Sequence, residues 1–121
     1  MYMSKIQVYH LSSCSTCKRI INEINIPKDA LIKCIKENPI KKEDLEKMFA
    51  ITKSYEALFS RRAIKYKTMG LKEKTLSEED YKNLILNEYT FLKRPVFIIE
   101  NEIYIGNSKK TIELLKKKLK N

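Results

Sequence analysis

Near both ends of the chain, short apolar stretches bounded by polar residues are typical of strands. Apolar residues alternate along the stretch Ile6-Gln7-Val8-Tyr9, which predicts a buried first strand. Asn101-Glu102 separates two later apolar stretches and is expected to form a tight hairpin connection. The four strands expected from this pattern cover residues 5–10, 30–35, 96–99 and 103–105.

Between these stretches, apolar residues recur at helical spacing. Ser77-Glu78-Glu79-Asp80 resembles a capping box, and Ser108 is expected to cap a last amphipathic helix. Gly70-Leu71 is a typical signal for the C-terminal end of a helix. The other helices are expected over residues 15–25, 42–50, 54–69 (open to a break near Ser60) and from 77 to about 89.

The order of elements is strand, helix, strand, then a helical block, then two strands and a helix. This order predicts an α/β protein with a mixed four-stranded sheet, in the thioredoxin-like fold with a helical insertion. At 121 residues, the chain is expected to form one domain over residues 1–121, with the insertion at about 42–90.

The segment Cys14-Ser15-Thr16-Cys17 carries the clearest chemical signal. It lies between the first strand and the first helix, so Cys14 is expected at a helix N-terminus, where free N–H groups and the helix dipole stabilise a thiolate. Cys17 follows one turn later on the same helix face, close enough for a disulfide after modest adjustment. A C-x-x-C pair in this position indicates thiol redox chemistry.

The amino-acid composition bears on the cellular compartment and on the class of partner. Lysine and arginine number 25 against 15 aspartate and glutamate, for a net charge of +10, which suits an anionic partner and can equally reflect lysine-rich composition. No basic-then-apolar leader and no run of 18 apolar residues is seen, so we expect no signal peptide and no membrane partner. Three cysteines without an export signal favour free thiols in a reducing cytoplasm.

Three segments resemble the family that contains the glutaredoxin-coupled arsenate reductase ArsC and the redox regulator Spx. They are residues 10–18, with His10 and the two cysteines; residues 58–71, with Arg61 and Arg62; and residues 92–106, with Arg94 and Pro95. The resemblance runs from about residue 5 to about residue 119 and implies a thioredoxin-like fold.

The resemblance also implies roles for individual residues. Cys14 matches the nucleophile that attacks arsenate or a disulfide, and Cys17 matches the second redox cysteine of Spx-like members. Arg94 matches an arginine that steadies the oxyanion, and Pro95 matches a cis-proline beside the active cysteine. The expected anion-binding set is therefore Arg94, Arg61, Arg62, Lys18 and Pro95.

This chain departs from the family pattern at three positions. Arsenate reductases of the family place three arginines around the anion; one of these falls on Ser60, next to Arg61 and Arg62, and another falls near Gly106. The Spx glycine that contacts RNA polymerase falls on Ser54. Two functions consequently stay open: an oxidoreductase acting on an oxyanion such as arsenate or on a disulfide, and a redox-switched regulator that binds RNA polymerase.

The remaining candidates have plainer interpretations. Cys34 is expected to pack in the core, and His10 either tunes Cys14 or serves as a hydrogen-bonded structural residue. Cysteine and histidine spacing does not indicate a zinc site, and no nucleic-acid-binding motif appears, so neither a metal nor direct DNA binding is expected. No bound cofactor is expected, and glutathione, glutaredoxin or thioredoxin would serve as the external reductant.

Overall fold

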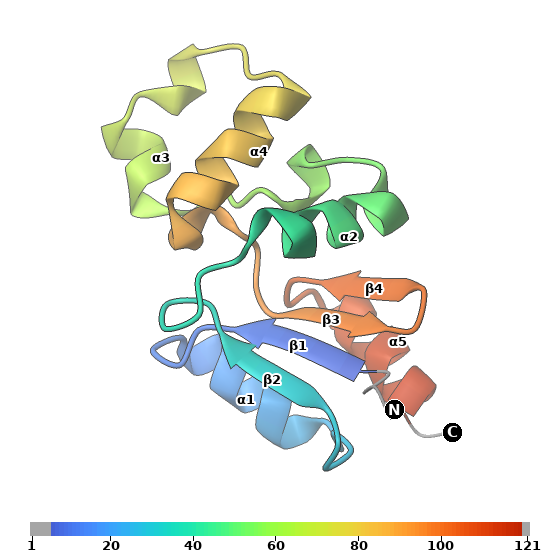
Figure 1. Ribbon diagram of the computed structural model, residues 1–121. Helices are drawn as coiled ribbons and strands as arrows, with labels where there is room; N and C mark the ends of the chain where they lie inside the picture. Colours follow the sequence, from blue (N-terminus) through green and yellow to red (C-terminus); the bar gives the residue numbers. More distant parts are fainter. Residues whose placement is uncertain (1–5, 120–121) are drawn as a thin grey trace. The chain divides into compact units, whose positions relative to one another are not determined.

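Four short strands form one mixed sheet in the order β2-β1-β3-β4 (Figure 1). The computed structural model of the protein describes residues 6–119. β1 runs parallel to β2 and antiparallel to β3, and β3 runs antiparallel to β4. This arrangement confirms the thioredoxin-like fold that the order of elements predicts. The strands are β1 (Ile6–His10), β2 (Leu31–Cys34), β3 (Val96–Ile99) and β4 (Glu102–Ile105).

The strands agree with the sequence pattern except at the ends. The first strand was expected from residue 5, which lies outside the described residues, and the second is shorter at both ends than expected. The expected hairpin connection at Asn101-Glu102 is wrong by one residue. Glu102 already pairs with Ile99, so Glu100 and Asn101 form the turn, and Glu100 adopts a φ of 56° to make it.

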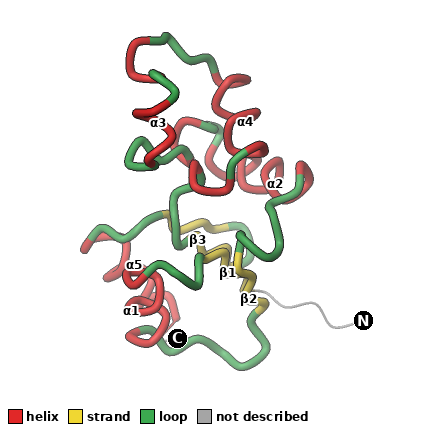
Figure 2. Tube along the Cα trace, turned by 90° about the vertical axis from the view of Figure 1, so that its left-hand side faces the viewer, coloured by secondary structure: helices red, strands yellow, loops and turns green. Residues whose placement is uncertain are grey.

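Helices α1 (Ser15–Glu23) and α5 (Lys109–Leu119) lie against one face of the sheet (Figure 2). Alternation along the strands directs Ile6 and Val8 of β1, and Phe97 and Ile99 of β3, to that face. They pack there against apolar residues of both helices, and an ion pair of 2.8 Å between Lys116 and Glu23 joins α5 to α1. The helical members of this core are Ile20, Ile24, Ile112 and Leu115.

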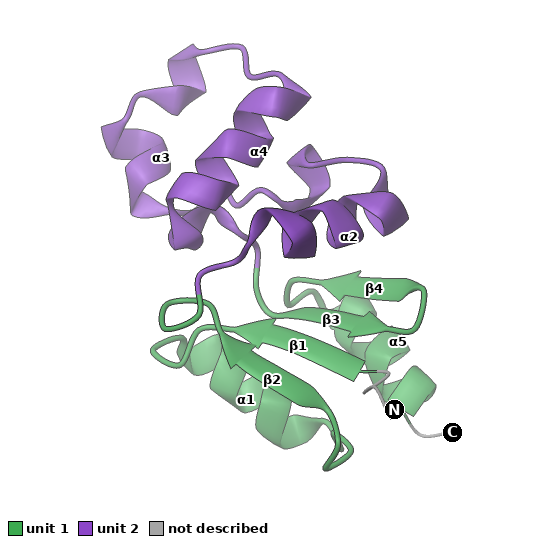
Figure 3. Cartoon of the chain, in the orientation of Figure 1, with its two compact units in different colours: residues 1–38, 94–121 green, residues 39–93 purple. Residues whose placement is uncertain are grey.

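The chain divides into two compact units (Figure 3). Of the described residues, 6–38 and 94–119 form the first, which we call the sheet unit, and 39–93 form the second, which we call the helical unit. The single domain expected over residues 1–121 stays a prediction.

The helical unit contains α2 (Lys42–Thr52), α3 (Ile64–Thr68) and α4 (Glu78–Asn87). The expected helix over 54–69 is broken, as the sequence allowed, and only Ile64–Thr68 of it is α-helical. A single 3-10 turn, Glu56–Leu58, is followed by Phe59 in an extended conformation that bridges to Leu92. The Phe59 side chain is 0% exposed, and its ring lies 4.9 Å from those of both Tyr81 and Phe91. Burial of this ring outweighs local helix propensity. Two more 3-10 turns, Leu71–Glu73 and Tyr89–Phe91, complete the unit.

The expected capping signals are present, although α1, α2 and α4 each end two residues from the expected position. Ser77 Oγ accepts from the Asp80 N–H at 3.2 Å while the Ser77 N–H donates to the Asp80 carboxylate at 2.9 Å, which confirms the capping box. Ser108 Oγ accepts from the Thr111 N–H at 3.1 Å at the start of α5. Gly70, after α3, has a φ of 65°.

Among the helices of residues 6–119, none has the length and apolar character that a membrane span requires.

Candidate functional site

Cys14 is the N-cap residue of α1, as the sequence predicts. Its backbone is extended, with φ −88° and ψ 110°, and its Sγ accepts from the Cys17 N–H at 3.4 Å. The Cys14 N–H donates to the Leu11 carbonyl at 2.9 Å, which closes a turn over residues 11–14. A sulfur in the N-cap position faces the unpaired N–H groups of the first helical turn, so negative charge on it is stabilised.

The environment of Cys14 favours its thiolate. Partial burial acts to raise the pKa of the Cys14 thiol, but hydrogen bonds from the backbone and thiol of Cys17, the charge of Arg94 and the Thr16 N–H together outweigh it, and the pKa is lowered. A lowered pKa at a partly exposed sulfur is the condition for a nucleophilic cysteine near neutral pH.

Cys17 lies in the opposite environment. It is 0% exposed and, with Ile20, belongs to the buried side of α1. Burial raises the pKa of the Cys17 thiol to about 11, although the Leu11 N–H and the Arg94 charge oppose that rise. Both cysteines are reduced in this structure. The pair therefore consists of one thiol whose pKa is lowered and one whose pKa is raised.

Arg94 and Pro95 come directly before β3. The Arg94–Pro95 peptide bond is cis, as the resemblance implies, and the Pro95 carbonyl accepts from the Gly106 N–H at 2.9 Å. Arg94 is half-buried, and its charge acts on the sulfurs of both Cys14 and Cys17. The sheet unit thus places a guanidinium within electrostatic reach of the candidate nucleophile.

Gly106 explains one departure from the family pattern. It has a φ of 83°, a backbone conformation that residues with a Cβ rarely adopt. An arginine at this position would be strained, so the third arginine of the family's anion site has no direct replacement here.

His10 ends β1, at the start of the loop that leads to Cys14. Its Nδ1 is buried and has no hydrogen-bond partner among the described residues, so that nitrogen does not serve as the expected structural hydrogen bond. Burial lowers the pKa of His10, against the opposing charge of Glu37. The imidazole is therefore held toward its neutral form.

Cys34 is buried, as expected, but it also contacts the loop that precedes Cys14. Its thiol donates to Ser12 Oγ at 3.5 Å, two residues before Cys14. The hydroxyl and backbone N–H of Ser12 lower the pKa of Cys34 to about 7; burial opposes them, and the N–H groups of Lys36 and Glu37 add to the lowering. The sequence pattern did not reveal this, because the contact joins residues 22 positions apart.

The other predicted anion-binding residues lie in different places. Lys18 is exposed in the first turn of α1, where its N–H donates to the Cys14 carbonyl at 3.1 Å. Arg61 belongs to the helical unit and binds the Glu56 carboxylate at 2.6 Å and the Tyr81 hydroxyl at 3.0 Å. Arg62, also in the helical unit, is exposed. A role for Arg61 and Arg62 at the Cys14 site stays a prediction.

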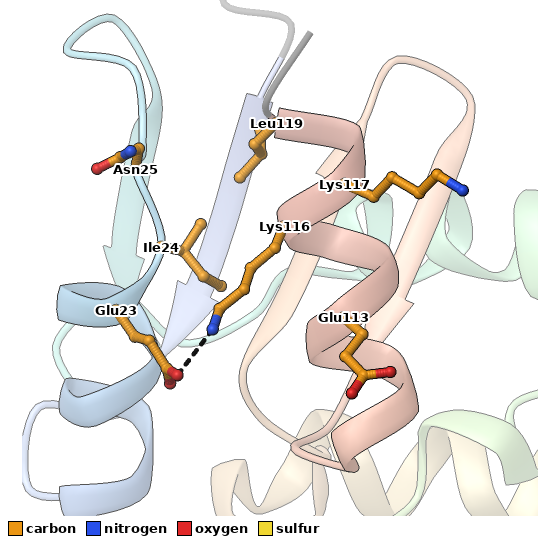
Figure 4. Close-up of a pocket in the computed structure, with 7 residues that line it drawn as sticks. All are labelled: Glu23, Ile24, Asn25, Glu113, Lys116, Lys117 and Leu119. Carbon is orange, nitrogen blue, oxygen red and sulfur yellow. Dashed lines mark hydrogen bonds and ion pairs between the residues drawn. The ribbon is translucent and has the colours of Figure 1, made fainter.

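A cavity of about 450 Å³ lies between the C-terminal end of α1 and helix α5 (Figure 4). Cys14 caps the opposite end of α1, about 13 Å away for a nine-residue helix at 1.5 Å per residue. The cavity is thus separate from the cysteine site. The residues that line the cavity are Glu23, Ile24, Asn25, Glu113, Lys116, Lys117 and Leu119.

Within residues 6–119, no cluster of histidine, cysteine, aspartate or glutamate could hold a metal ion.

Solved structures with the same fold include an ArsC family related protein from Bacteroides fragilis, with a TM-score of 0.73 and 23% sequence identity over 95% of this chain and 100% of that one. A possible arsenate reductase from Streptococcus mutans has a TM-score of 0.70 and 24% identity over 88% of this chain and 93% of that chain. An arsenate reductase from Vibrio cholerae has a TM-score of 0.70 and 16% identity over 91% and 96%. At these identities, the similarity establishes the fold.

Among curated proteins, no sequence relative was found. The family assignment comes instead from the sequence model of the ArsC family, which matches residues 9–115. That span includes the candidate nucleophile Cys14, its partner Cys17 and the Arg94–Pro95 pair. The chain belongs to the ArsC family.

Proposed function

We propose that the protein is an arsenate-reductase-like thiol oxidoreductase of the cytoplasm, with Cys14 as nucleophile and Cys17 as resolving cysteine. The observation that carries the proposal is the position of Cys14 at the N-terminus of α1, where its pKa is lowered and Arg94 lies within electrostatic reach. Membership of the ArsC family supports the same chemistry.

In the first step, the Cys14 thiolate attacks the substrate. With a disulfide, a Cys14–sulfur bond forms, the substrate's own sulfur–sulfur bond breaks, and one thiolate leaves. With arsenate, a Cys14–arsenic bond forms, and an oxygen of arsenate leaves as water after taking two protons. The N–H groups at the start of α1 and the Arg94 guanidinium offset the negative charge of the oxyanion.

In the second step, a thiol attacks the Cys14 sulfur. Attack by Cys17 gives a Cys14–Cys17 disulfide and releases the substrate thiolate, or leaves two electrons on arsenic to give arsenite. Glutathione can attack in place of Cys17 and give a mixed disulfide on Cys14. Thiols of a glutaredoxin or thioredoxin system then reduce either disulfide and return Cys14 to its starting state.

The anion-binding residues decide which substrate suits the site better. Arg94, with Lys18 and with Arg61 or Arg62, would bind an oxyanion, but Gly106 supplies no side chain where the family has an arginine. Disulfide exchange does not require that missing charge. We therefore expect weak arsenate turnover and faster turnover of a disulfide substrate.

The test measures the oxidation of the reductant with arsenate as substrate and, separately, with a disulfide as substrate. Each substrate is tried once with reduced glutathione plus glutaredoxin and once with a thioredoxin system. Cys14→Ser should abolish turnover, while the matched variant of its exposed neighbour, Ser13→Ala, should retain most of it. If Cys14→Ser is as active as the unaltered protein with every substrate and reductant, the proposed function is wrong.

A second candidate function rests on Cys17, because Spx-like regulators have a cysteine where the arsenate reductases have serine. In that function, a Cys14–Cys17 disulfide changes the affinity for RNA polymerase, and neither DNA nor a membrane is a direct partner. Binding of the oxidised and the reduced protein to purified RNA polymerase would test it. Redox-dependent binding without turnover favours the regulator, and turnover without binding favours the enzyme.

A further inference from the structure

Three cysteine sulfurs contact the turn formed by residues 11–14. Cys14 ends this turn, through the 2.9 Å hydrogen bond from its N–H to the Leu11 carbonyl. The Leu11 N–H faces the sulfur of Cys17, and the Ser12 N–H and hydroxyl face the sulfur of Cys34. Cys34 is therefore not an isolated buried cysteine. It shares one short loop with the two redox cysteines of the proposed function.

Strand register accounts for this position. Cys34 is the partner of His10 in the parallel ladder, and neighbouring strands lie about 4.8 Å apart. Because residues paired across a ladder project to the same face, the Cys34 side chain projects to the face that α1 covers, where Cys17 is buried. The two strands end at this pair, and β1 continues directly into the loop that holds Cys14.

We propose that Cys34 is a second resolving thiol, which competes with Cys17 for the sulfur of Cys14 once Cys14 carries a mixed disulfide. The proposal rests on the proposed function, since it needs Cys14 as the nucleophile. The Cys34 thiolate attacks Cys14 Sγ, a Cys14–Cys34 disulfide forms, the bond from Cys14 to the substrate sulfur breaks, and the substrate leaves as a thiolate that takes up a proton. The electrons balance, because one disulfide replaces another.

The larger thiolate fraction of Cys34 allows it to compete with Cys17 for the sulfur of Cys14. At pH 7, a thiol with a pKa of about 7 is about half thiolate, whereas one with a pKa of about 11 has roughly one thiolate in 10⁴. The more basic thiolate is intrinsically the better nucleophile, by roughly 40- to 100-fold over this difference in pKa. Cys34 keeps a net advantage of roughly 50- to 125-fold for each productive encounter.

Distance from Cys14 favours Cys17. Cys17 lies one helical turn from Cys14, with its N–H 3.4 Å from Cys14 Sγ. A disulfide between Cys14 and Cys34 requires their two Cα atoms to lie within about 7 Å of each other. Ser12 and Ser13, which form the middle of the turn between the two cysteines, are exposed.

The test uses one equivalent of 5,5′-dithiobis(2-nitrobenzoate) for each protein molecule and follows the coloured thiolate. Attack by Cys14 releases the first coloured thiolate, and resolution releases the second. In Cys17→Ala, the second release should persist, should level off above about pH 7, and should leave a Cys14–Cys34 disulfide in non-reducing peptide maps. In Cys34→Ala, resolution should depend on Cys17 alone and keep rising about tenfold per pH unit beyond pH 8.

Two further variants separate the possible failures. The double variant Cys17→Ala with Cys34→Ala should release one coloured thiolate and hold one thionitrobenzoate group on Cys14 as a mixed disulfide; if no adduct forms there, the proposed function itself is wrong. If that adduct forms but Cys17→Ala also fails to release it, or if Cys34 is found as a free thiol in its maps, only the role of Cys34 is overturned. Ser12→Ala in the Cys17→Ala background keeps the Cys34 thiol, and it should move the levelling-off to higher pH by removing the hydroxyl at 3.5 Å.

Discussion

Replacement of Arg94 by alanine should slow the reaction of Cys14 with alkylating agents at acid pH. The Arg94 charge is among the causes that lower the pKa of Cys14, and it opposes the effect of burial. Without it, a smaller fraction of Cys14 is thiolate at any pH below the pKa. Where Cys14 is fully ionised, the rate should rise by about twofold, because the thiolate of a thiol with a higher pKa is the better nucleophile.

Coulomb's law sets the size of this effect. For charges about 6 Å apart, the interaction lies between about 0.7 kcal/mol in water and about 2.8 kcal/mol at an effective dielectric constant of 20. Arg94 is half-buried rather than enclosed, so screening by solvent favours the lower part of that range. About 1 kcal/mol corresponds to about a fivefold loss of thiolate at pH 6. The remaining thiolate is about twofold more nucleophilic, so the alkylation rate should fall by about two- to threefold.

The assay is labelling by iodoacetamide between pH 5 and 9, with the Cys14 peptide quantified by mass spectrometry. Arg94→Lys keeps a positive charge and should recover most of the rate at pH 6, and Lys93→Ala, which removes an exposed neighbouring charge, should have little effect. Equal pH profiles for Arg94→Ala and the unaltered protein would refute the electrostatic role of Arg94. A loss in Arg94→Lys as large as in Arg94→Ala would point to shape rather than charge.

The other predictions concern stability, measured by urea unfolding followed by tyrosine fluorescence. Phe59→Ala should cost about 3–5 kcal/mol because the ring is 0% exposed, while Ile64→Ala, at a residue that is 81% exposed, should cost little. Ser77→Ala should cost about 1 kcal/mol through loss of the capping box, and Ser77→Thr should keep most of it. The hydrogen bond from Lys65 at 2.6 Å lowers the pKa of Glu88, although partial burial opposes this. The contribution of Glu88 to the free energy of unfolding should therefore be complete above about pH 5 and be lost as the pH falls through that lowered pKa. Glu88→Gln should remove the pH-dependent contribution of Glu88 to the free energy of unfolding. If this variant loses as much stability between pH 5 and acid pH as the unaltered protein, the reasoning is contradicted.

Much of the sheet unit could be predicted from the sequence because its signals are local. Alternation of apolar residues marks β1, a run of four apolar residues marks β3, and the position of Cys14 between a strand and a helix predicts its role as N-cap. The cis bond before Pro95 did not follow from local pattern and came from the family resemblance.

The rest depends on contacts between residues far apart in the chain. The segment at 54–69 has helical spacing, yet Phe59 becomes extended because Leu92, more than 30 positions later, pairs with it. The interpretation of Cys34 as a core residue was incomplete for the same reason, since its sulfur contacts the hydroxyl of Ser12, which lies 22 positions earlier in the chain.

The antiparallel pairing of β3 with β1 has a consequence for protein synthesis. β1 is made early, but its antiparallel partner β3 and the adjoining Arg94 follow Cys14 by about 80 residues. At 5–20 residues per second, the ribosome needs roughly 4–16 s to make that interval. During this time Cys14 exists without the guanidinium that favours its thiolate, so a nascent chain is less nucleophilic at this position than the finished protein. The order of synthesis thus delays full reactivity until β3 is available to pair with β1.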